Sequence, residues 1–112
     1  MSMSERQVEG VGGLPLYARL EAGRPDAPVL MLGHSIGSDC TGWDALLPRL
    51  RDEFRVLCFD RRGHGRSGVP DAEASIDVLG HDALAVLDAF AVPRAHFVGL
   101  SQGGMEGMWL AA

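Results

Sequence analysis

The sequence predicts an α/β fold with a mostly parallel sheet and flanking helices. Short apolar runs at residues 29–32 and 56–59 have the composition of strands that are buried on both faces, and a third apolar run at residues 95–98 leads into the last helix-like segment. Segments with helical spacing of apolar residues follow each of these runs. Buried strands that alternate with amphipathic helices imply parallel pairing through right-handed crossovers. Because a hairpin pattern precedes the first run, we expect a hairpin followed by three parallel strands.

The hairpin is predicted at the start of the chain. Residues 7–11 form a short strand, and Gly12 and Gly13 supply the turn. Residues 14–21 then alternate between apolar and polar side chains, as in a strand with one buried face. The apolar residues that share this face are Leu14, Leu16, Ala18 and Leu20.

A first helix is expected after the strand at residues 29–32. Its apolar residues have i, i+3, i+4, i+7 spacing and are Trp43, Leu46, Leu47 and Leu50. The residues that could cap its beginning are Ser38, Asp39 and Thr41. Pro48 falls inside this pattern, so we expect the helix to be kinked or short.

A second helix is predicted to begin after Ser75, which can cap it, with Asp77 in the first turn where the helix dipole favours negative charge. Its expected buried stripe consists of Ile76, Leu79, Ala83, Val86, Leu87 and Phe90. Pro93 closes the connection to the last strand.

Composition narrows the possible functions. The 112 residues suffice for one small domain, and the net charge of −5 gives no electrostatic basis for binding nucleic acid or an anionic membrane. All ten basic residues are arginines, which fits a compositional bias or, alternatively, anion recognition. Cys40 and Cys58 suggest no disulfide framework, and residues 1–7 lack an apolar signal core, so a cytoplasmic protein is expected.

The most informative motif is Gly-Leu-Ser-Gln-Gly at residues 99–103, between the last strand and a helix-like run. Gly-x-Ser-x-Gly in this context is the signature of a nucleophile elbow, a sharp turn that exposes a serine hydroxyl. Gly99 and Gly103 lack the Cβ atoms that would clash with adjacent backbone in such a turn. A simpler interpretation is that Ser101 only caps the helix.

Two further glycine-rich loops follow strands, at residues 33–39 and 60–68. Ligand sites in parallel sheets lie beyond the carboxyl ends of the strands, so the three loops are expected to converge on one site.

Together these loops resemble the α/β-hydrolase fold. The segments are Leu-Gly-His-Ser-Ile-Gly at 32–37, Phe-Asp-Arg-Arg-Gly-His-Gly-Arg-Ser at 59–67 and Gly-Leu-Ser-Gln-Gly-Gly-Met at 99–105. With Trp-Asp at 43–44, they are similar to the 3-oxoadipate enol-lactonase group. Cofactor-free haloperoxidases, esterases and carbon–carbon bond hydrolases share most of these loops and remain alternatives.

The resemblance implies that Ser101 is the nucleophile and that the backbone N–H groups of Ile36 and Gln102 form the oxyanion hole. His34, Gly99 and Gly103 would shape the site. The substrate would be 3-oxoadipate enol-lactone or a similar small lactone or ester in aromatic-compound degradation, and no metal or organic cofactor would be needed. Ordinary packing is the alternative role for Ile36.

Other conspicuous residues have structural interpretations. His64 is expected to hold its turn, and Asp60 to organise that turn through nearby N–H groups. Trp43 and Trp109 lie on helical stripes and are more typical of core than of a substrate platform. The arginines of the second loop are expected to be solvated or structural rather than substrate-binding: Arg61, Arg62 and Arg66.

The sequence departs from the family pattern after Ser101. In this fold the chain order is serine, then acid, then histidine, yet no Asp or His follows Ser101 and Glu106 is the only acid there. Every histidine precedes the serine: His34, His64, His81 and His96. We therefore expect residues 1–112 to be the N-terminal part of a single α/β-hydrolase domain, without its lid, triad acid and histidine.

Three interpretations of the 112-residue chain itself remain open. The chain could be an inert fragment, one half of an enzyme that is completed by another chain, or a complete small binding module. The serine-bearing strand would lie at an open sheet edge, so loose packing or self-association through that edge is expected.

Overall fold

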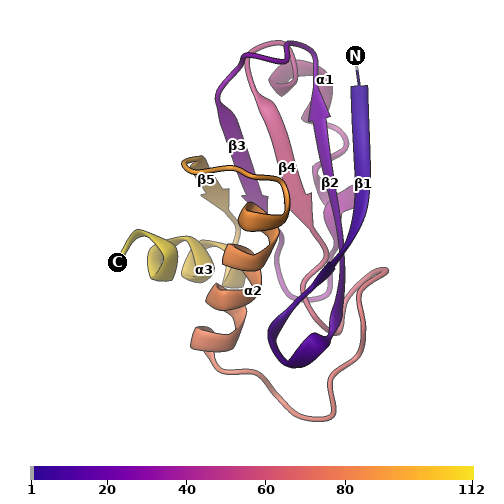
Figure 1. Cartoon of the computed structure of the whole chain (residues 1–112), viewed down its shortest axis with the longest axis vertical. Helices are drawn as coiled ribbons and strands as arrows, with labels where there is room; N and C mark the ends of the chain where they lie inside the picture. Colours follow the sequence, from indigo (N-terminus) through magenta and orange to yellow (C-terminus); the bar gives the residue numbers. More distant parts are fainter. Residues whose placement is uncertain (1) are drawn as a thin grey trace.

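The computed structural model of the protein describes residues 2–112 and contains one five-stranded sheet with strand order β1-β2-β4-β3-β5 (Figure 1). The strands are β1 (Ser2–Glu9), β2 (Pro15–Ala22), β3 (Val29–Gly33), β4 (Arg55–Phe59) and β5 (His96–Gly99). β1 pairs antiparallel with β2 and β2 antiparallel with β4, whereas β3 is parallel to both β4 and β5. The predicted hairpin and three parallel strands are thus confirmed.

The hairpin is longer than the sequence pattern indicates. β1 begins at Ser2 rather than near residue 7, because its polar residues pair with β2 over the full length of that strand. The turn is a short 3-10 segment, η1 (Val11–Gly13), in which Gly12 and Gly13 have φ angles of 70° and 80°. Both glycines therefore adopt the left-handed backbone that the predicted turn requires.

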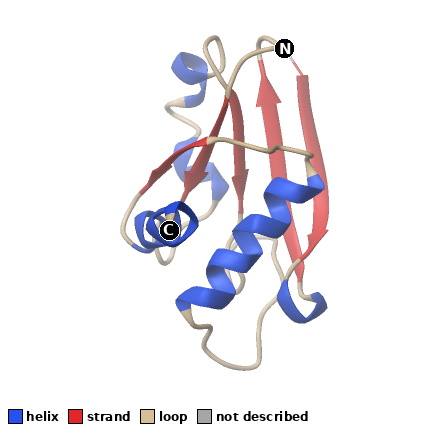
Figure 2. Ribbon diagram, turned by 60° about the vertical axis from the view of Figure 1, so that its left-hand side comes forward, coloured by secondary structure: helices blue, strands red, loops and turns tan. Residues whose placement is uncertain are grey.

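Helices cover both faces of the sheet (Figure 2). One face carries α2 (Ile76–Ala89) and α3 (Gln102–Ala111), and the other carries the 3-10 segment η2 (Cys40–Trp43) and the short helix α1 (Leu47–Leu50). Residues alternate between these layers along β3. Val29 and Met31 pack in the cluster beneath α2, and Leu30 and Leu32 pack in the cluster beneath η2 and α1.

The first predicted helix is divided. Asp39 caps η2 by accepting a hydrogen bond from the Thr41 N–H at 2.8 Å, and Pro48 lies in the first turn of α1. The helix is short, as the proline predicts. Its expected buried stripe is incomplete because Leu46 lies between the two segments and is exposed.

The second predicted helix is α2. Ser75 caps it by accepting a hydrogen bond from the Val78 N–H at 3.3 Å. Trp109 of α3 packs closely against Gly80 of this helix. A Cβ added at Gly80 would lie 2.2 Å from the Trp109 ring. Its indole N–H donates to Asp77 at 2.8 Å. The predicted packing role of Trp109 is therefore confirmed.

The serine-bearing strand β5 pairs only with β3 and forms one edge of the sheet within residues 2–112. Several apolar side chains near this edge are exposed: Val98, Leu100, Met105 and Met108. Over the same residues, no helix has the length and apolar character needed to cross a membrane.

Candidate active site

Ser101 occupies a strained turn between β5 and α3. Its backbone has φ 57° and ψ −120°, a conformation that residues with a Cβ rarely adopt. The side chain is exposed and makes no capping hydrogen bond to the helix that it precedes. The simpler interpretation of Ser101 as a capping residue is thus not supported by its contacts, whereas strain at an exposed hydroxyl is typical of functional sites.

Close backbone contacts produce this turn. A Cβ on Gly99 would lie 2.3 Å from the carbonyl carbon of Gly103, and a Cβ on Gly103 would collide with the backbone of Gly33. The Leu100 N–H donates to the Gly33 carbonyl at 3.0 Å, so the end of β3 is hydrogen-bonded to the turn. Both glycines therefore have the steric role that the sequence predicts for them.

The two residues that are expected to form the oxyanion hole line one cavity. Ile36, on the loop after β3, and Gln102, the first residue of α3, line the same cavity of about 440 Å³. No hydrogen bond within residues 2–112 uses either backbone N–H. The Ile36 side chain is exposed, so it does not have the ordinary packing role that was its alternative. The arrangement leaves the N–H groups of two cavity-lining residues available, and one of these residues, Gln102, directly follows the exposed Ser101.

His34 is buried at the base of this loop. Its Nδ1–H donates to the Ser35 carbonyl at 2.7 Å, and its Nε2 accepts from the Arg61 N–H at 2.9 Å. Burial lowers the pKa of His34, and the nearby Arg61 acts in the same direction. The ring is therefore a neutral link between the first and second glycine loops, which fits its predicted site-shaping role.

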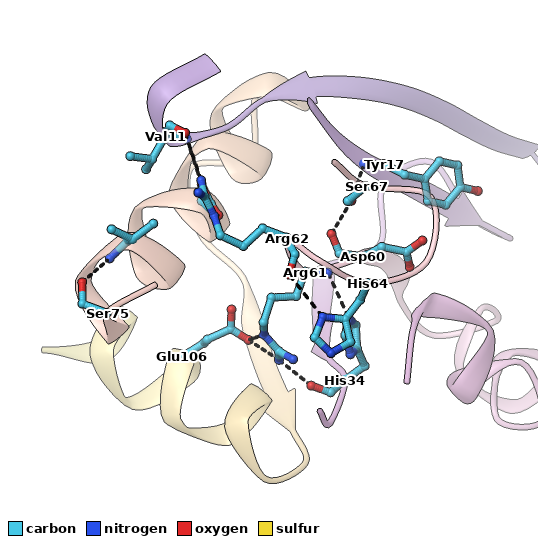
Figure 3. A network of polar contacts seen from close by, with 12 residues as sticks. Val11, Tyr17, His34, Asp60, Arg61, Arg62, His64, Ser67, Ser75 and Glu106 are labelled. Atoms are coloured by element: carbon cyan, nitrogen blue, oxygen red, sulfur yellow. Dashed lines mark hydrogen bonds and ion pairs between the residues drawn. The ribbon is translucent and has the colours of Figure 1, made fainter. Parts of the chain in front are cut away.

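His64 makes a second link between the same loops (Figure 3). Its Nε2 accepts from the Gly37 N–H at 3.0 Å, and its Nδ1 lies 3.2 Å from the Arg62 carbonyl. Its ring centroid is 5.1 Å from that of His34. With both nitrogens engaged, His64 holds the turn, as expected, and does not contact the serine.

Asp60 organises the second glycine loop. Its carboxylate accepts hydrogen bonds from the Cys40 N–H at 2.7 Å and the Arg66 N–H at 2.9 Å. Its carbonyl accepts from the Ser67 hydroxyl, which in turn accepts from the Tyr17 N–H at 2.9 Å. The structural role that the sequence predicts for Asp60 is therefore confirmed.

Arg61 and Arg62 are structural, and neither is solvated. Arg62 forms a two-point ion pair with Asp82 of α2, at 2.7 and 3.0 Å, and also donates to the Val11 carbonyl. Arg61 is buried and pairs with Glu106 of α3 at 2.7 Å (Figure 3). Arg66 is exposed and pairs with Glu5 of β1.

The Arg61–Glu106 pair was not predicted. In the sequence, Glu106 stands out only as the sole acid after the serine, and its partner lies 45 residues earlier in the chain. A glutamate on the apolar stripe of a short helix is the signal that could have indicated a buried ion pair.

No side chain within residues 2–112 hydrogen-bonds to the Ser101 hydroxyl. His81 instead lies against the Trp109 ring, at a centroid distance of 4.9 Å, and His96 lies against Phe54 at 6.0 Å. The described residues thus provide an exposed serine on a strained turn and two backbone N–H donors. None of the four histidines is placed to act as the base for Ser101.

Known proteins share both sequence and structure with this chain. The family model for the alpha/beta hydrolase fold matches residues 28–112. A 3-oxoadipate enol-lactonase from Acinetobacter baylyi is 40% identical over 89 residues, which are 80% of this chain and 33% of that protein. A putative carbamate hydrolase from Stutzerimonas stutzeri is 36% identical over 98 residues, covering 86% of this chain and 36% of that protein.

Solved structures agree with these matches. A hydrolase from Pseudomonas aeruginosa has a TM-score of 0.91 and 45% identity, with coverage of 96% of this chain and 40% of that chain. The enol-lactonase from Burkholderia xenovorans has a TM-score of 0.87 and 37% identity, with coverage of 96% and 41%. The chain therefore spans about a third of the length of the curated relatives that it matches.

Proposed function

Because the chain belongs to the alpha/beta hydrolase family, we propose that its protein is a hydrolase that cleaves a small lactone or ester through Ser101. The supporting observations are an exposed serine on a strained turn and the unused N–H groups of Gln102, which directly follows that serine, and of Ile36, which lines the same cavity as Gln102. We further propose 3-oxoadipate enol-lactone as the substrate, on the basis of the enol-lactonase relatives.

The chemistry proposed for this geometry is acyl transfer. The Ser101 Oγ attacks the ester carbonyl carbon, a base removes the hydroxyl proton, and the carbonyl oxygen becomes negatively charged. The Ile36 and Gln102 N–H groups donate to that oxygen and stabilise it. The ring or ester C–O bond then breaks, its oxygen takes up the proton, and water hydrolyses the resulting acyl-enzyme.

The base and its orienting acid are proposed to come from residues outside this sequence, either in the same polypeptide or in a complementary chain. This proposal is supported by the engagement of His34 and His64 in loop contacts and by the greater length of the relatives. The alternative is that the 112 residues alone form an inert fragment. Carbamate hydrolysis at the same serine is a second candidate, favoured by the carbamate hydrolase relatives.

The test compares the purified 112-residue chain with the protein expressed from its complete coding sequence. Enol-lactone, an activated phenyl ester and a simple carbamate are offered to each. We expect the complete protein to open the enol-lactone and Ser101→Ala to abolish this turnover, whereas Ser4→Ala, on exposed β1, retains it. The 112-residue chain should show no turnover above background.

Three results would contradict parts of this proposal. Turnover by the 112-residue chain that Ser101→Ala abolishes would refute the external base. Preferential cleavage of the carbamate would replace the lactone as substrate. Activity that survives Ser101→Ala in the complete protein would remove the serine from the mechanism.

A further inference from the structure

The ion pair between Arg61 and Glu106 joins the second glycine loop to α3 and is buried. The exposed fractions of the two side chains are 3% and 1%. The guanidinium donates to Glu106 Oε1 through Nη2 at 2.7 Å and through Nε at 3.2 Å. Two polar atoms of the pair, Arg61 Nη1 and Glu106 Oε2, are buried without a hydrogen-bond partner in the described part of the chain.

A buried ion pair with unsatisfied polar atoms contributes little to the stability of the fold. Removing two charges from water costs several kcal/mol for each ion, and the attraction between them returns this cost only when the remaining polar atoms are also satisfied. Here they are not. The same burial raises the pKa of Glu106, although the hydrogen bond from Arg61 acts in the opposite direction. The pair therefore calls for a role other than net stabilisation.

The position of each partner suggests that role. Glu106 follows Gln102 by four residues in α3, so the two residues lie on the same face of the helix, one turn apart. Arg61 holds His34 at two points: its Nη2 donates to the His34 carbonyl, and its N–H donates to His34 Nε2. His34 is two residues before Ile36 in the same loop.

The contacts therefore form a continuous connection between the two unused N–H donors. It runs from Gln102 along one helical turn to Glu106, across the ion pair to Arg61, and through His34 to the loop that carries Ile36. Figure 3 shows the central part of this connection, from Glu106 through Arg61 to His34. The His34–Ser35 and Gly37–His64 hydrogen bonds fix the rest of that loop.

We propose that the buried Arg61–Glu106 pair is a positioning device that sets the Ile36 and Gln102 N–H groups at the separation required for one oxyanion. Neither residue touches the reacting atoms. The inference rests on the proposed function for its catalytic consequence, but the positional coupling itself can be tested on the chain without turnover.

The first experiment measures kinetics in the protein expressed from its complete coding sequence. Glu106→Gln keeps the shape of the side chain and removes its charge. We expect kcat to fall by about tenfold to a hundredfold, because a donor displaced by about an ångström loses most of its stabilisation of the transition state. KM should change by less than about twofold, because the donors act mainly on charge that develops in the transition state.

A double variant separates positioning from stability. Arg61→Met with Glu106→Leu fills the same space without charge, and such replacements are commonly neutral or stabilising. We expect the midpoint of unfolding to equal or exceed that of the wild type, while kcat stays as low as in Glu106→Gln. The control is Arg66→Met with Glu5→Gln, which removes an exposed ion pair of the same glycine loop and should leave kcat unchanged.

The second experiment measures amide hydrogen exchange in the purified 112-residue chain. The informative amides are those of Gly37, Ser38 and Arg61, which are hydrogen-bonded in or against the Ile36 loop. In Glu106→Gln we expect their exchange to accelerate by about tenfold or more relative to amides of β3 and β4, which report unfolding of the sheet.

The outcomes keep the two proposals apart. If the complete protein is inactive while the Gly37 amide of the 112-residue chain still responds to Glu106→Gln, the proposed function is refuted and the coupling is supported. The coupling is refuted by exchange that rises equally in the loop and the sheet. It is also refuted when the double variant retains full kcat.

Discussion

Gly103 and Gly33 are so close that a Cβ on Gly103 would lie 2.1 Å from the Gly33 carbonyl oxygen. Both partners are backbone, so no flexible side chain can move aside. The contact brings the first turn of α3 onto the end of β3, and it thereby places the serine turn next to the Ile36 loop. Packing of the turn that carries Ser101 therefore depends on the absence of a side chain at residue 103.

Gly103→Ala is therefore expected to destabilise the fold by about 2–3 kcal/mol, the usual cost of overpacking a tight contact. Gly104→Ala is the matched control, since its Cβ would come no nearer than 3.4 Å to the Gly99 carbonyl oxygen. That variant should gain about 0.5–1 kcal/mol from reduced backbone entropy in a helix. Urea unfolding of both variants measures the difference, and equal midpoints would contradict the steric argument.

Asp82→Ala should be among the most damaging substitutions in the chain. Asp82 is fully buried, pairs with Arg62 and accepts a hydrogen bond from the Val11 N–H at 2.8 Å. Its removal leaves a largely buried guanidinium and a backbone donor without partners, at a cost of about 3–5 kcal/mol.

The control for this prediction is Asp26→Ala, which breaks an exposed pair with Arg24 and should change stability by less than about 0.5 kcal/mol. Thermal unfolding of both variants gives the comparison. A similar shift in both midpoints would show that the buried position of Asp82 carries no special weight.

His34 should make the stability of the chain depend on pH. Because burial lowers its folded-state pKa below 6.5, the unfolded chain binds the proton first as the pH falls. The free energy of unfolding then decreases as the pH falls below about 6.5, by at most about 1.4 kcal/mol per pH unit, and levels off below the folded-state pKa.

His34→Gln removes this contribution. The stability advantage of the wild type over the variant should therefore shrink between about pH 8 and about pH 5. Glu106, whose pKa is raised by burial, contributes in the opposite direction, but it is present in both proteins and largely cancels in the difference. His96→Gln at an exposed position is the control. A constant difference across the pH range would show that His34 does not carry the effect.

Local signals in the sequence predicted much of the fold. Ser75 and Asp39 cap helical segments because their short polar side chains can reach backbone N–H groups two or three residues ahead. Pro48 shortens its helix because of its ring and its missing donor. The turn at residues 99–103 was predictable because crowding there permits few residue types. Each of these rules acts within a few residues of the chain.

Features that depend on distant partners were not predictable in this way. The length of β1 is set by its pairing with β2 and not by its own polar sequence. Leu46 matches the helical stripe but is exposed, because α1 begins only at the next residue. The Arg61–Glu106 pair joins residues whose neighbours in sequence give no indication of each other, and only the parallel sheet brings them together.

We propose that the open edge of β5 leads two copies of the 112-residue chain to associate. The edge strand pairs on one side only within residues 2–112, and Val98 is 50% exposed on it. Unpaired edge strands with apolar side chains favour pairing with another strand, and a charged lysine on the strand opposes it. Val98→Lys should therefore shift the chain toward monomer in sedimentation velocity.

The control is Val69→Lys, since Val69 is 80% exposed in the loop after β4, away from this edge. It should leave the distribution of species unchanged. A wild-type chain that stays monomeric as its concentration is raised would contradict the proposal, as would an equal response of the two variants.

Ser101 itself provides the sharpest test of strain at the site. Its φ of 57° with ψ of −120° is a backbone conformation that costs of order 1–3 kcal/mol for a residue with a Cβ and little for glycine. Ser101→Gly should therefore be more stable than Ser101→Ala by about 1–2 kcal/mol, although glycine ordinarily loses more entropy on folding. Both variants lack the hydroxyl, so the comparison isolates the backbone. Chemical denaturation of the two proteins measures it. If alanine proved equal or superior to glycine, the serine turn would be relaxed, and the exposed hydroxyl would have to be explained without stored strain.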